Sequence, residues 1–497
     1  MVDTTSRPAH GAPAFLRDGQ PWDFAARREV ARQSLEALRR PQPENVPRPP
    51  GPPPLRTLIR LMRRTKGTDL FGGVARDYPG IAYIRLGREH LYVLSDPELV
   101  VQVLLTDARH TTKSRALAQT KSLLGEGLLT SEGELHRRQR SLVMPAFHRA
   151  RIAGYSRDMV GAAVAHGEGW ADRLARGERE LDMAADMSTL TLGIVGRALF
   201  GEDLSGDAAE VGHALGEVLE NFDRSLLPTA KLAERVRAPW VRRVERAVED
   251  LDRLVARMIA EHRESGDTGD LMSMLLASTD ADGAMSDAQV RDETMTLLLA
   301  GHETTAMALT WAWHLLDRDR DQTARLHAEL DEVLGGRPPT FEDLPRLPFT
   351  RAVVAETMRI YPPAWILGRS LADDLEVGGW RLPAGSIVLT LPWVMHRDAR
   401  FWPDPLEFRP GRWLTAEGTF DERAPGQPRG TWFPFGYGQR RCIGDQFAWT
   451  EAQLVLATLA GRFTPQVVAG HRVDVRPAVT LRPDGGMPMV LRERRQG

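Results

Sequence analysis

The chain is poor in several features that mark particular classes of protein. Its 497 residues contain one cysteine, so an internal disulfide and a cysteine-rich zinc or iron–sulfur site are excluded. No stretch approaches the ~18 consecutive apolar residues of a membrane helix. Charged side chains also interrupt the first forty residues, where a signal peptide would need an apolar core. These absences predict a cytoplasmic protein without a transmembrane anchor.

The chain also lacks an excess of charge of one sign. It has 65 basic and 67 acidic residues, which leave a formal net charge of −2 and give no support for nucleic-acid binding. Apolar residues make up 42% of the sequence and charged residues 27%, as in ordinary globular proteins, so a largely disordered chain is excluded.

Proline marks the one boundary that the sequence suggests. Residues 41–54 read PQPENVPRPPGPPP, which predicts an extended, semi-rigid linker. We therefore expect an N-terminal arm with this linker over residues 1–54 and one large domain over residues 55–497, because no second linker or repeat follows. Within the arm, residues 21–40 predict a short helix. That helix either packs on the domain or contacts a membrane surface or a partner.

The large domain is predicted to be mainly α-helical, with small β-sheets to one side. Strand patterns occupy residues 81–86 and 91–94, and another strand pair is expected around residues 377–380 and 387–391. The last forty residues also favour strands. Almost everything else has helical periodicity.

The longest predicted helix runs from Asp287 to about Leu316 and would span roughly 45 Å. Ser286 and Gln289 form a capping-box pattern at its start. Residues 300–305 read AGHETT, which places a glycine, a carboxylate and two hydroxyls inside an apolar run. Glycine costs about 1 kcal/mol relative to alanine there. The stretch is therefore either functional or a packing glycine with solvated polar neighbours.

A second helix is expected over residues 350–361, ended by Pro362 and Pro363. Glu356 and Arg359 lie three residues apart and share one face of it. Such a pair means little alone, because exposed pairs of this kind are common and weak. The segment 408–413, FRPGRW, supplies a further arginine, Arg412.

The single cysteine lies in the segment 435–444, FGYGQRRCIG. Its glycines allow a tight loop, and both the arginines before Cys442 and the helix predicted after it favour a thiolate. A lone cysteine is often buried and inert. A nucleophile would need a nearby base, and no histidine lies between His396 and His471. A thiolate metal ligand fits the pattern better.

Four motifs together resemble those of the cytochrome P450 monooxygenases. The cysteine segment matches F-x-x-G-x-R-x-C-x-G, the long helix matches A-G-x-[DE]-T-T, and Glu356 with Arg359 matches E-x-x-R. Arg412 would be the third member of that last cluster. The resemblance covers about residues 50–495 and implies the P450 fold. Residues 410–413, PGRW, depart from the family's Pro-Glu-Arg-Phe, so we expect the cluster to form with a looser rim.

The resemblance implies a bound haem b (iron protoporphyrin IX) with Cys442 as the iron ligand. Phe435 would shield the sulfur, while Ala300 and Gly301 would leave room for oxygen. The residues expected at the haem propionates are His136, Arg140, Arg369 and Arg440. For Arg369 the alternative is a surface ion pair, and for His136 it is a solvated helix face.

The same resemblance implies that one oxygen atom from O2 is inserted into a hydrophobic small molecule. Glu303 would pass protons inward and Thr304 would hydrogen-bond the oxygen held at the haem iron. The chain has no G-x-G-x-x-G fingerprint or flavin domain. The resemblance implies that electrons come from a separate ferredoxin or flavodoxin with an NAD(P)H-dependent reductase. A basic docking face would comprise Arg137, Arg138 and Arg441, unless these are merely solvated.

The walls of the substrate pocket are expected to be mainly apolar. The expected pocket walls are Leu297, Ala300, Thr304 and residues 362–367, covered by residues 115–129 and 218–236. Segments 334–347 and 361–370 resemble terpene-oxidising bacterial P450s, which favours a terpenoid. A fatty-acid or macrolide hydroxylase stays open. So do a peroxide-driven or isomerising haem-thiolate enzyme, a haem-based sensor, and a helical scaffold without haem.

Overall fold

The computed structural model describes residues 46–494 apart from several short segments. These are residues 55, 58, 60–64, 87–88, 119, 202–210, 213, 219–220, 222–232, 234, 267–268, 278, 281–282 and 424–425. The helix predicted at residues 21–40 and most of the predicted cover at 218–236 lie outside the described residues.

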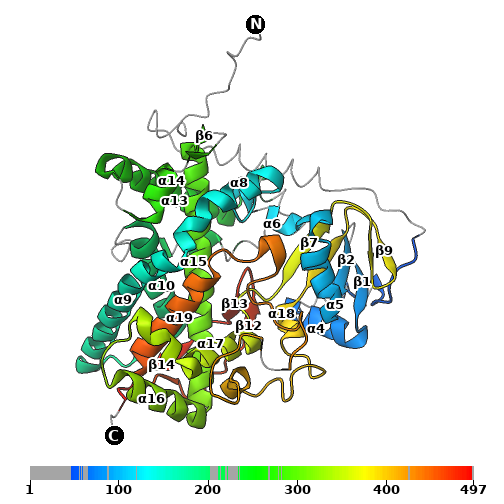
Figure 1. Ribbon diagram of the computed structural model, residues 1–497. Coiled ribbons are helices and arrows are strands. Elements are labelled where there is room, and N and C mark those ends of the chain that lie inside the picture. The colour runs from blue at the N-terminus through cyan, green and yellow to red at the C-terminus, as the bar shows by residue number, and fades with distance from the viewer. Residues whose placement is uncertain are drawn as a thin grey trace.

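Helices form most of the described chain, and the five-stranded sheet lies at one side of them, whereas the smaller sheets are spread over the molecule (Figure 1). The predicted fold class is therefore confirmed. The longer helices are α4 (Gly67–Asp77), α8 (Gly133–Val143), α9 (Arg149–Ala175), α10 (Met183–Phe200), α13 (Pro239–Ser265), α15 (Asp287–Arg318), α16 (Arg320–Leu334), α17 (Pro348–Ile360) and α19 (Asp445–Ala460). The shorter ones are α5 (Pro97–Val101), α6 (Arg115–Ala118), α7 (Lys121–Leu124), α14 (Leu271–Ala277) and α18 (Pro392–Met395).

The largest sheet has the strand order β1-β2-β10-β7-β3. Its strands are β1 (Ile81–Leu86), β2 (Glu89–Leu94), β3 (Thr111–Lys113), β7 (Leu367–Leu371) and β10 (Ile387–Thr390). The predicted pair at residues 81–94 is confirmed as the antiparallel strands β1 and β2, with Ile81 opposite Leu94. Strand β10 then pairs with β2 in parallel and with β7 antiparallel.

The second predicted strand pair was wrong in its pairing. Residues 377–380 span the turn of a hairpin in which β8 (Leu375–Val377) pairs with β9 (Trp380–Leu382). Residues 387–390 instead join the large sheet. Gly378 and Gly379, with φ of 59° and 78°, make the tight turn possible. The predicted C-terminal strands are present as β11 (Gln466–Val467), β12 (Val475–Pro477), β13 (Leu481–Pro483) and β14 (Pro488–Val490). Strand β14 also pairs with β4 (Glu180–Asp182), and β5 (Thr279–Asp280) pairs with β6 (Gly283–Ala284).

Helix α15 crosses the middle of the domain (Figure 1). The predicted capping box is present, since Ser286 and Gln289 each bond the other's backbone N–H. A Cβ on Gly301 would lie 3.0 Å from Cγ2 of Val195 in α10, so this glycine lets the two helices approach closely. The packing interpretation of Gly301 therefore has a physical basis. It does not explain the polar residues beside it.

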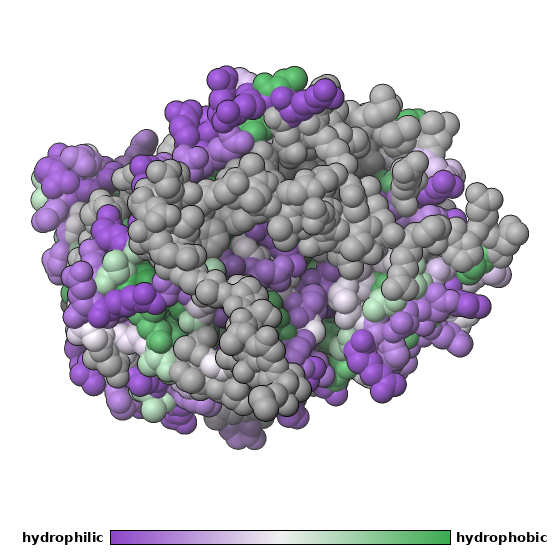
Figure 2. Space-filling model, turned by 90° about the horizontal axis from the view of Figure 1, so that it is seen from above, coloured by the Kyte–Doolittle hydropathy of each residue, from purple (hydrophilic) through white to green (hydrophobic). Residues whose placement is uncertain are grey.

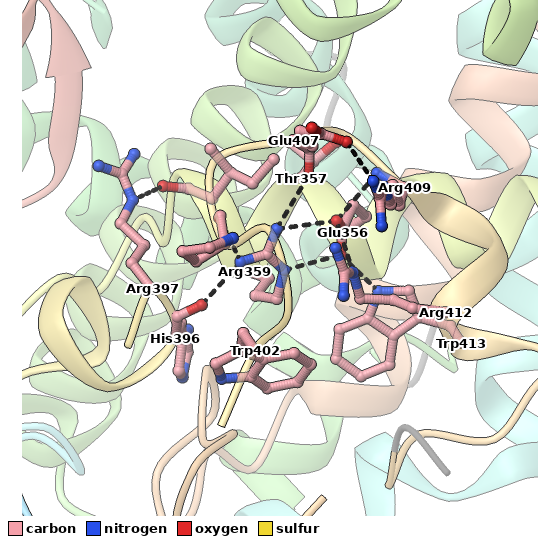
Figure 3. A network of polar contacts seen from close by, with 12 residues as sticks. Glu356, Thr357, Arg359, His396, Arg397, Trp402, Glu407, Arg409, Arg412 and Trp413 are labelled. Atoms are coloured by element: carbon pink, nitrogen blue, oxygen red, sulfur yellow. Dashed lines mark hydrogen bonds and ion pairs between the residues drawn. The ribbon is translucent and has the colours of Figure 1, made fainter. Parts of the chain in front are cut away.

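Figure 3 shows how Glu356 ties α17 to the long loop after α18. Arg359 donates to both carboxylate oxygens of Glu356 at 2.8 Å, and both side chains are fully buried. Arg412 donates to the same carboxylate at 2.9 Å. Trp413 also donates to Glu356 at 2.9 Å and is fully buried. The looser rim expected here was wrong, because the tryptophan supplies both packing and a hydrogen bond.

The described part of the proline-rich segment packs against β1. The amide of Tyr83 donates to the carbonyl of Pro50 at 3.0 Å, and Arg48 donates to the Tyr83 hydroxyl at 2.7 Å. A Cβ on Gly51 would lie only 1.8 Å from the Tyr83 carbonyl oxygen. Residues 48–51 therefore lie along the sheet edge, while the proposed boundary at residue 54 stays a prediction.

The outer surface offers little continuous apolar area in the view of Figure 2, where the described residues are mainly hydrophilic and hydrophobic residues form small patches. Within the described part of the chain, no helix is both long enough and apolar enough to cross a membrane.

Candidate functional site

The cysteine loop is folded tightly around Cys442. The amide of Cys442 donates to the Phe435 carbonyl at 2.9 Å, and the amide of Gly436 donates to Phe433 at 3.0 Å. Gly438 has φ of 67°, and a Cβ there would lie 2.7 Å from the Leu104 carbonyl oxygen. Helix α19 begins three residues after the cysteine. The glycines and the following helix thus hold the sulfur in one place, as predicted.

Cys442 faces an enclosed space. The residue has accessible surface, yet the protein around it is dense enough for burial to raise the pKa of its thiol to about 11. A side chain with both properties lies against an internal space rather than on the outer surface. Arg140 and Arg441 lower this pKa, as the sequence suggested, but burial has the larger effect. The arginines alone therefore do not make the thiolate, and a metal ion that binds the sulfur would.

Helix α15 opens toward accessible space at its unusual motif. Among residues 287–317 of this helix, Ala300 is the one exposed residue, and Gly301 and Thr304 are partly exposed. The Thr304 hydroxyl donates to the Ala300 carbonyl at 2.9 Å. Ala300, Gly301 and Thr304 therefore share one accessible strip on a helix that is otherwise buried. This arrangement agrees with the groove that the motif predicts.

The carboxylate of Glu303 is bonded by two residues from near the end of the chain. Its Oε1 accepts from the Thr480 hydroxyl at 2.8 Å and lies 2.6 Å from Nε of Arg482. Both partners belong to the hairpin formed by β12 and β13, here called the C-terminal hairpin. Glu303 therefore directly precedes Thr304 in the chain, but its carboxylate is held toward Arg482.

The residues expected at the haem propionates gather with a further lysine. Lys113 of β3 and Arg369 of β7 are cross-strand partners. Lys113 donates to the carbonyls of Leu128 and Ser131 at 2.7 Å and lies 3.4 Å from Nδ1 of His136. Arg140 donates to the Arg441 carbonyl at 2.9 Å. Arg440 is ion-paired with Glu132.

Positive charge is in excess at this cluster. Burial and the nearby Arg440 lower the pKa of Lys113 to about 7 and that of Arg369 to about 10. Burial, with Lys113 beside it, also lowers the pKa of His136 to about 3. Since His136 is buried, its alternative placement on a solvated helix face is contradicted. Like charges this close destabilise a sheet unless an anion offsets them.

Two nitrogen atoms of the cluster are also buried without a hydrogen-bond partner in the protein: Nε2 of His136 and one terminal nitrogen of Arg440. Buried polar groups of this kind cost free energy unless they find a hydrogen-bond partner. A haem would supply an iron to Cys442 and two carboxylates to these cations and donors. The residues present therefore fit a haem.

Several residues that surround the site were not predicted from the sequence. Lys113 and Glu132 belong to no motif and lie 19 residues apart. The pairing of β3 with β7 brings Lys113 to Arg369, and the amide of Lys113 donates to Glu132. Thr480 and Arg482 are 177 residues or more from Glu303. The last forty residues favoured strands, but no sequence signal specified their contact with α15.

Part of the segment predicted to cover the pocket packs on α15. Residues 123–128 lie along the first half of that helix, whereas Arg115 donates to the Gly385 carbonyl. Within that segment, the amides of Glu126 and Leu128 donate to Asp292 and Glu293 at 2.8 and 2.9 Å. A Cβ on Gly127 would lie 2.2 Å from Oγ1 of Thr296, so this segment approaches the helix very closely. On the predicted second wall, Trp365 is buried and Leu297 is buried on α15.

The three arginines of the predicted docking face differ in their surroundings. Arg137 is well exposed and paired with Glu134 on the same helix. Arg138 donates to the Gly283 carbonyl at 2.8 Å. Arg441 is ion-paired with Asp445 at 2.8 Å and with Glu422 at 3.5 Å. Arg137 is thus the freest to meet a partner of the three.

A model of the cytochrome P450 family matches residues 47–487. Cyclooctatin synthase of Streptomyces melanosporofaciens is 43% identical over 403 residues, which are 80% of this chain and 85% of that protein. Cyclooctat-9-en-7-ol 5-monooxygenase of the same organism is 39% identical over 83% of this chain and 88% of its own. Pentalenene oxygenase of Streptomyces avermitilis is 35% identical over 80% and 85%.

The fold, the cysteine loop and these matches define a haem-thiolate protein, and the chain belongs to the cytochrome P450 family. It is a P450 monooxygenase, which takes O2, a hydrophobic substrate and electrons from a redox partner.

Replacing Cys442 tests the assignment of the iron ligand. The Cys442→Ala protein should lose the thiolate-type spectrum of the reduced, CO-treated enzyme, because the chain has no other cysteine. A Cys442→His variant, which keeps a ligating side chain, shows whether haem is still held. If the thiolate-type spectrum survives in Cys442→Ala, the assignment is wrong.

Proposed function

We propose that this enzyme hydroxylates or epoxidises a terpenoid in natural-product biosynthesis. The observation that carries the proposal is the similarity, over four fifths of the chain, to enzymes named for cyclooctat-9-en-7-ol and pentalenene. The residues of the predicted walls are mainly apolar, which supports a hydrophobic substrate. A fatty-acid or macrolide substrate remains the alternative.

The cofactor of the proposed reaction is haem b, held by Cys442 and by the cationic cluster of His136, Arg140, Arg369 and Arg440. When bound, haem supplies the oxidising chemistry and the protein supplies orientation and a dry site. Phe435 lies against the loop next to Cys442 and packs its ring 5.8 Å from that of Trp449, a position that supports a role in excluding water.

The protons are proposed to pass through Glu303 and Thr304. Thr304 has the only hydroxyl on the accessible strip of α15 formed by Ala300, Gly301 and Thr304. In the structure it donates to Ala300, and a small rotation about χ1 would turn it toward the groove. A carboxylic acid and an alcohol one after the other can move a proton without bringing a charge into the apolar groove.

Electrons are proposed to come from a ferredoxin or flavodoxin reduced by an NAD(P)H-dependent reductase, which places the reaction in the cytoplasm. The support is the position of three basic side chains in the sequence. Arg137 and Arg138 directly follow His136, and Arg441 directly precedes Cys442. An acidic partner would be attracted to them, and the attraction would weaken as salt rises.

Binding of candidate substrates can be followed optically. We expect sesquiterpenes or related polycyclic hydrocarbons, titrated into the ferric enzyme, to shift the haem from low spin to high spin as water leaves the iron. Medium-chain fatty acids and a macrolide are the comparison ligands. A spin shift with fatty acids or the macrolide alone would contradict the terpenoid proposal. A purified protein that binds no haem would contradict the proposed monooxygenase reaction.

Replacing Thr304 tests the proton path. Thr304→Val keeps the shape of the side chain, so substrate binding should persist. Product formed per NAD(P)H should fall severalfold while hydrogen peroxide rises. Thr310→Val is the matched control, since Thr310 makes the same bond to the carbonyl four residues earlier, at 2.7 Å, but is buried away from the groove. Equal coupling in both variants would remove Thr304 from the path.

Charge reversal tests the docking face. Arg137→Glu should raise the ferredoxin concentration needed for half-maximal reduction by about tenfold, which is ~1.4 kcal/mol, and the effect should shrink as ionic strength rises. Arg176→Glu is the control, because Arg176 is similarly exposed and paired with Glu178 at the far end of α9. If the two variants behave alike, the basic residues are only solvated.

A further inference from the structure

Lys113 of β3 is buried against the segment that precedes α8. Its Nζ donates to the carbonyls of Leu128 and Ser131, both at 2.7 Å, and lies 3.4 Å from Nδ1 of the buried His136. A lysine ammonium has three N–H donors and no acceptor. Two of these donors go to the carbonyls, so the third is left for the ring of His136.

His136 has two ways to place its single ring proton. Burial, followed by the effect of Lys113, lowers the pKa of the imidazole to about 3, so the ring is neutral at ordinary pH. With the proton on Nδ1, the ring donates to the Leu128 carbonyl, whose oxygen is 3.2 Å away, and Nε2 can only accept. With the proton on Nε2, Nδ1 accepts from Lys113 and Nε2 becomes a donor.

The charge of Lys113 favours the second arrangement. A proton on Nδ1 would place a positive hydrogen beside the ammonium group, whereas the lone pair of an unprotonated Nδ1 is attracted to it. The Leu128 carbonyl does not need the ring proton, because Lys113 already donates to it. Burial and the nearby Arg440 lower the pKa of Lys113 to about 7, while Glu132 raises it. A negative charge bound among these cations would raise it further and keep Lys113 charged.

The place of the ring proton matters because of the surroundings of Nε2. That nitrogen is buried and has no hydrogen-bond partner among the described residues. His136 precedes Arg140 by four residues on α8, so the two side chains lie on one face of the helix. A haem carboxylate bound there would accept from a protonated Nε2, whereas an unprotonated Nε2 would repel it. The cationic cluster is therefore complete for a carboxylate in only one of the two tautomers.

We propose that Lys113 is a positioning residue that holds the ring proton of His136 on Nε2, so that the imidazole donates a hydrogen bond to a haem carboxylate. This inference rests on the haem site of the proposed function. Lys113 acts through His136, while its own donors stay on Leu128, Ser131 and Nδ1 of the ring. The ring gains and loses no proton, since only the nitrogen that carries it is fixed.

The tautomer can be read directly by nitrogen NMR. In the reduced, CO-treated holoenzyme with isotope-labelled histidine, the signals that His136→Gln removes belong to His136. The couplings of its two ring nitrogens to the ring C–H protons show which nitrogen is protonated. We expect the proton on Nε2 in the parent enzyme, and on Nδ1 or shared between both nitrogens in Lys113→Met. A proton on Nδ1 in the parent, or on Nε2 in both proteins, would overturn the proposal.

The hydrogen bond to the haem carboxylate gives a second readout. In Lys113→Met, the propionate bending band of the resonance Raman spectrum should shift, and transfer of haem to apomyoglobin should become severalfold faster, because the donor at Nε2 is lost. Lys113→Arg, which keeps the positive charge, should recover most of both properties. Lys66→Met is the matched control and should change neither, because Lys66 also donates to a backbone carbonyl, that of Val475, at 2.7 Å but is not part of the cationic cluster.

A glutamine at position 136 separates control of the tautomer from direct contact between Lys113 and the haem. The side-chain amide of His136→Gln can present an N–H in place of Nε2 whatever the charge of Lys113. In that background, Lys113→Met should have little further effect on the propionate band or on haem transfer, because residues that act through one another are not additive. Equal effects of Lys113→Met in both backgrounds would overturn the proposal.

Failure of the haem site itself would give a different result. His136→Ala should shift the propionate band and speed haem transfer while Lys113 is intact. If His136→Ala changes neither property, His136 does not hold the haem, and both its place in the proposed haem site and the role of Lys113 are wrong. If His136→Ala changes both properties and Lys113→Met changes neither, the haem site stands and the inference about Lys113 fails.

Discussion

Burial of α15 is the constraint on which the rest of the structure depends. In a helix enclosed along nearly its whole length, each polar group that finds no partner among its neighbours costs free energy. Gly301 provides the close approach of α10, and the C-terminal hairpin supplies Thr480 and Arg482 to Glu303. Between the two ends of the helix, the accessible strip at Ala300, Gly301 and Thr304 is then the one interruption, and it is the place where we propose that the proton path runs.

Buried charge organises the other parts of the site in the same way. Glu356 is satisfied by Arg359, Arg412 and Trp413, and this links α17 to the loop before the cysteine segment. The cations Lys113, Arg369 and Arg440 share Glu132 as an acidic neighbour, and Lys113 also lies near Glu293, whose carboxyl pKa is raised to about 8 by burial. The carboxylate of Glu356 is fully bonded within the protein, whereas the second cluster is suited to an anionic ligand.

Local patterns predicted the fold class, the long helix with its capping box, and the loop around Cys442, because those features depend on neighbouring residues. They could not predict contacts set by strand pairing across the chain. Lys113 reaches the arginines only through the pairing of β3 with β7, and Arg482 reaches Glu303 only through the docking of the hairpin. Trp413 shows the same limit, since its bond to Glu356 compensates for the missing family residues.

The thiol of Cys442 shows why counting nearby charges is insufficient. Arg140 and Arg441 favour the thiolate, but removal of water from the loop favours the neutral thiol more strongly, and the pKa rises to about 11. The same burial keeps water and other nucleophiles away from the sulfur once it is bound to a metal ion. A loop that disfavours a free thiolate but positions the sulfur at an enclosed space is suited to a ligand that acts only with its metal, and not to a nucleophile.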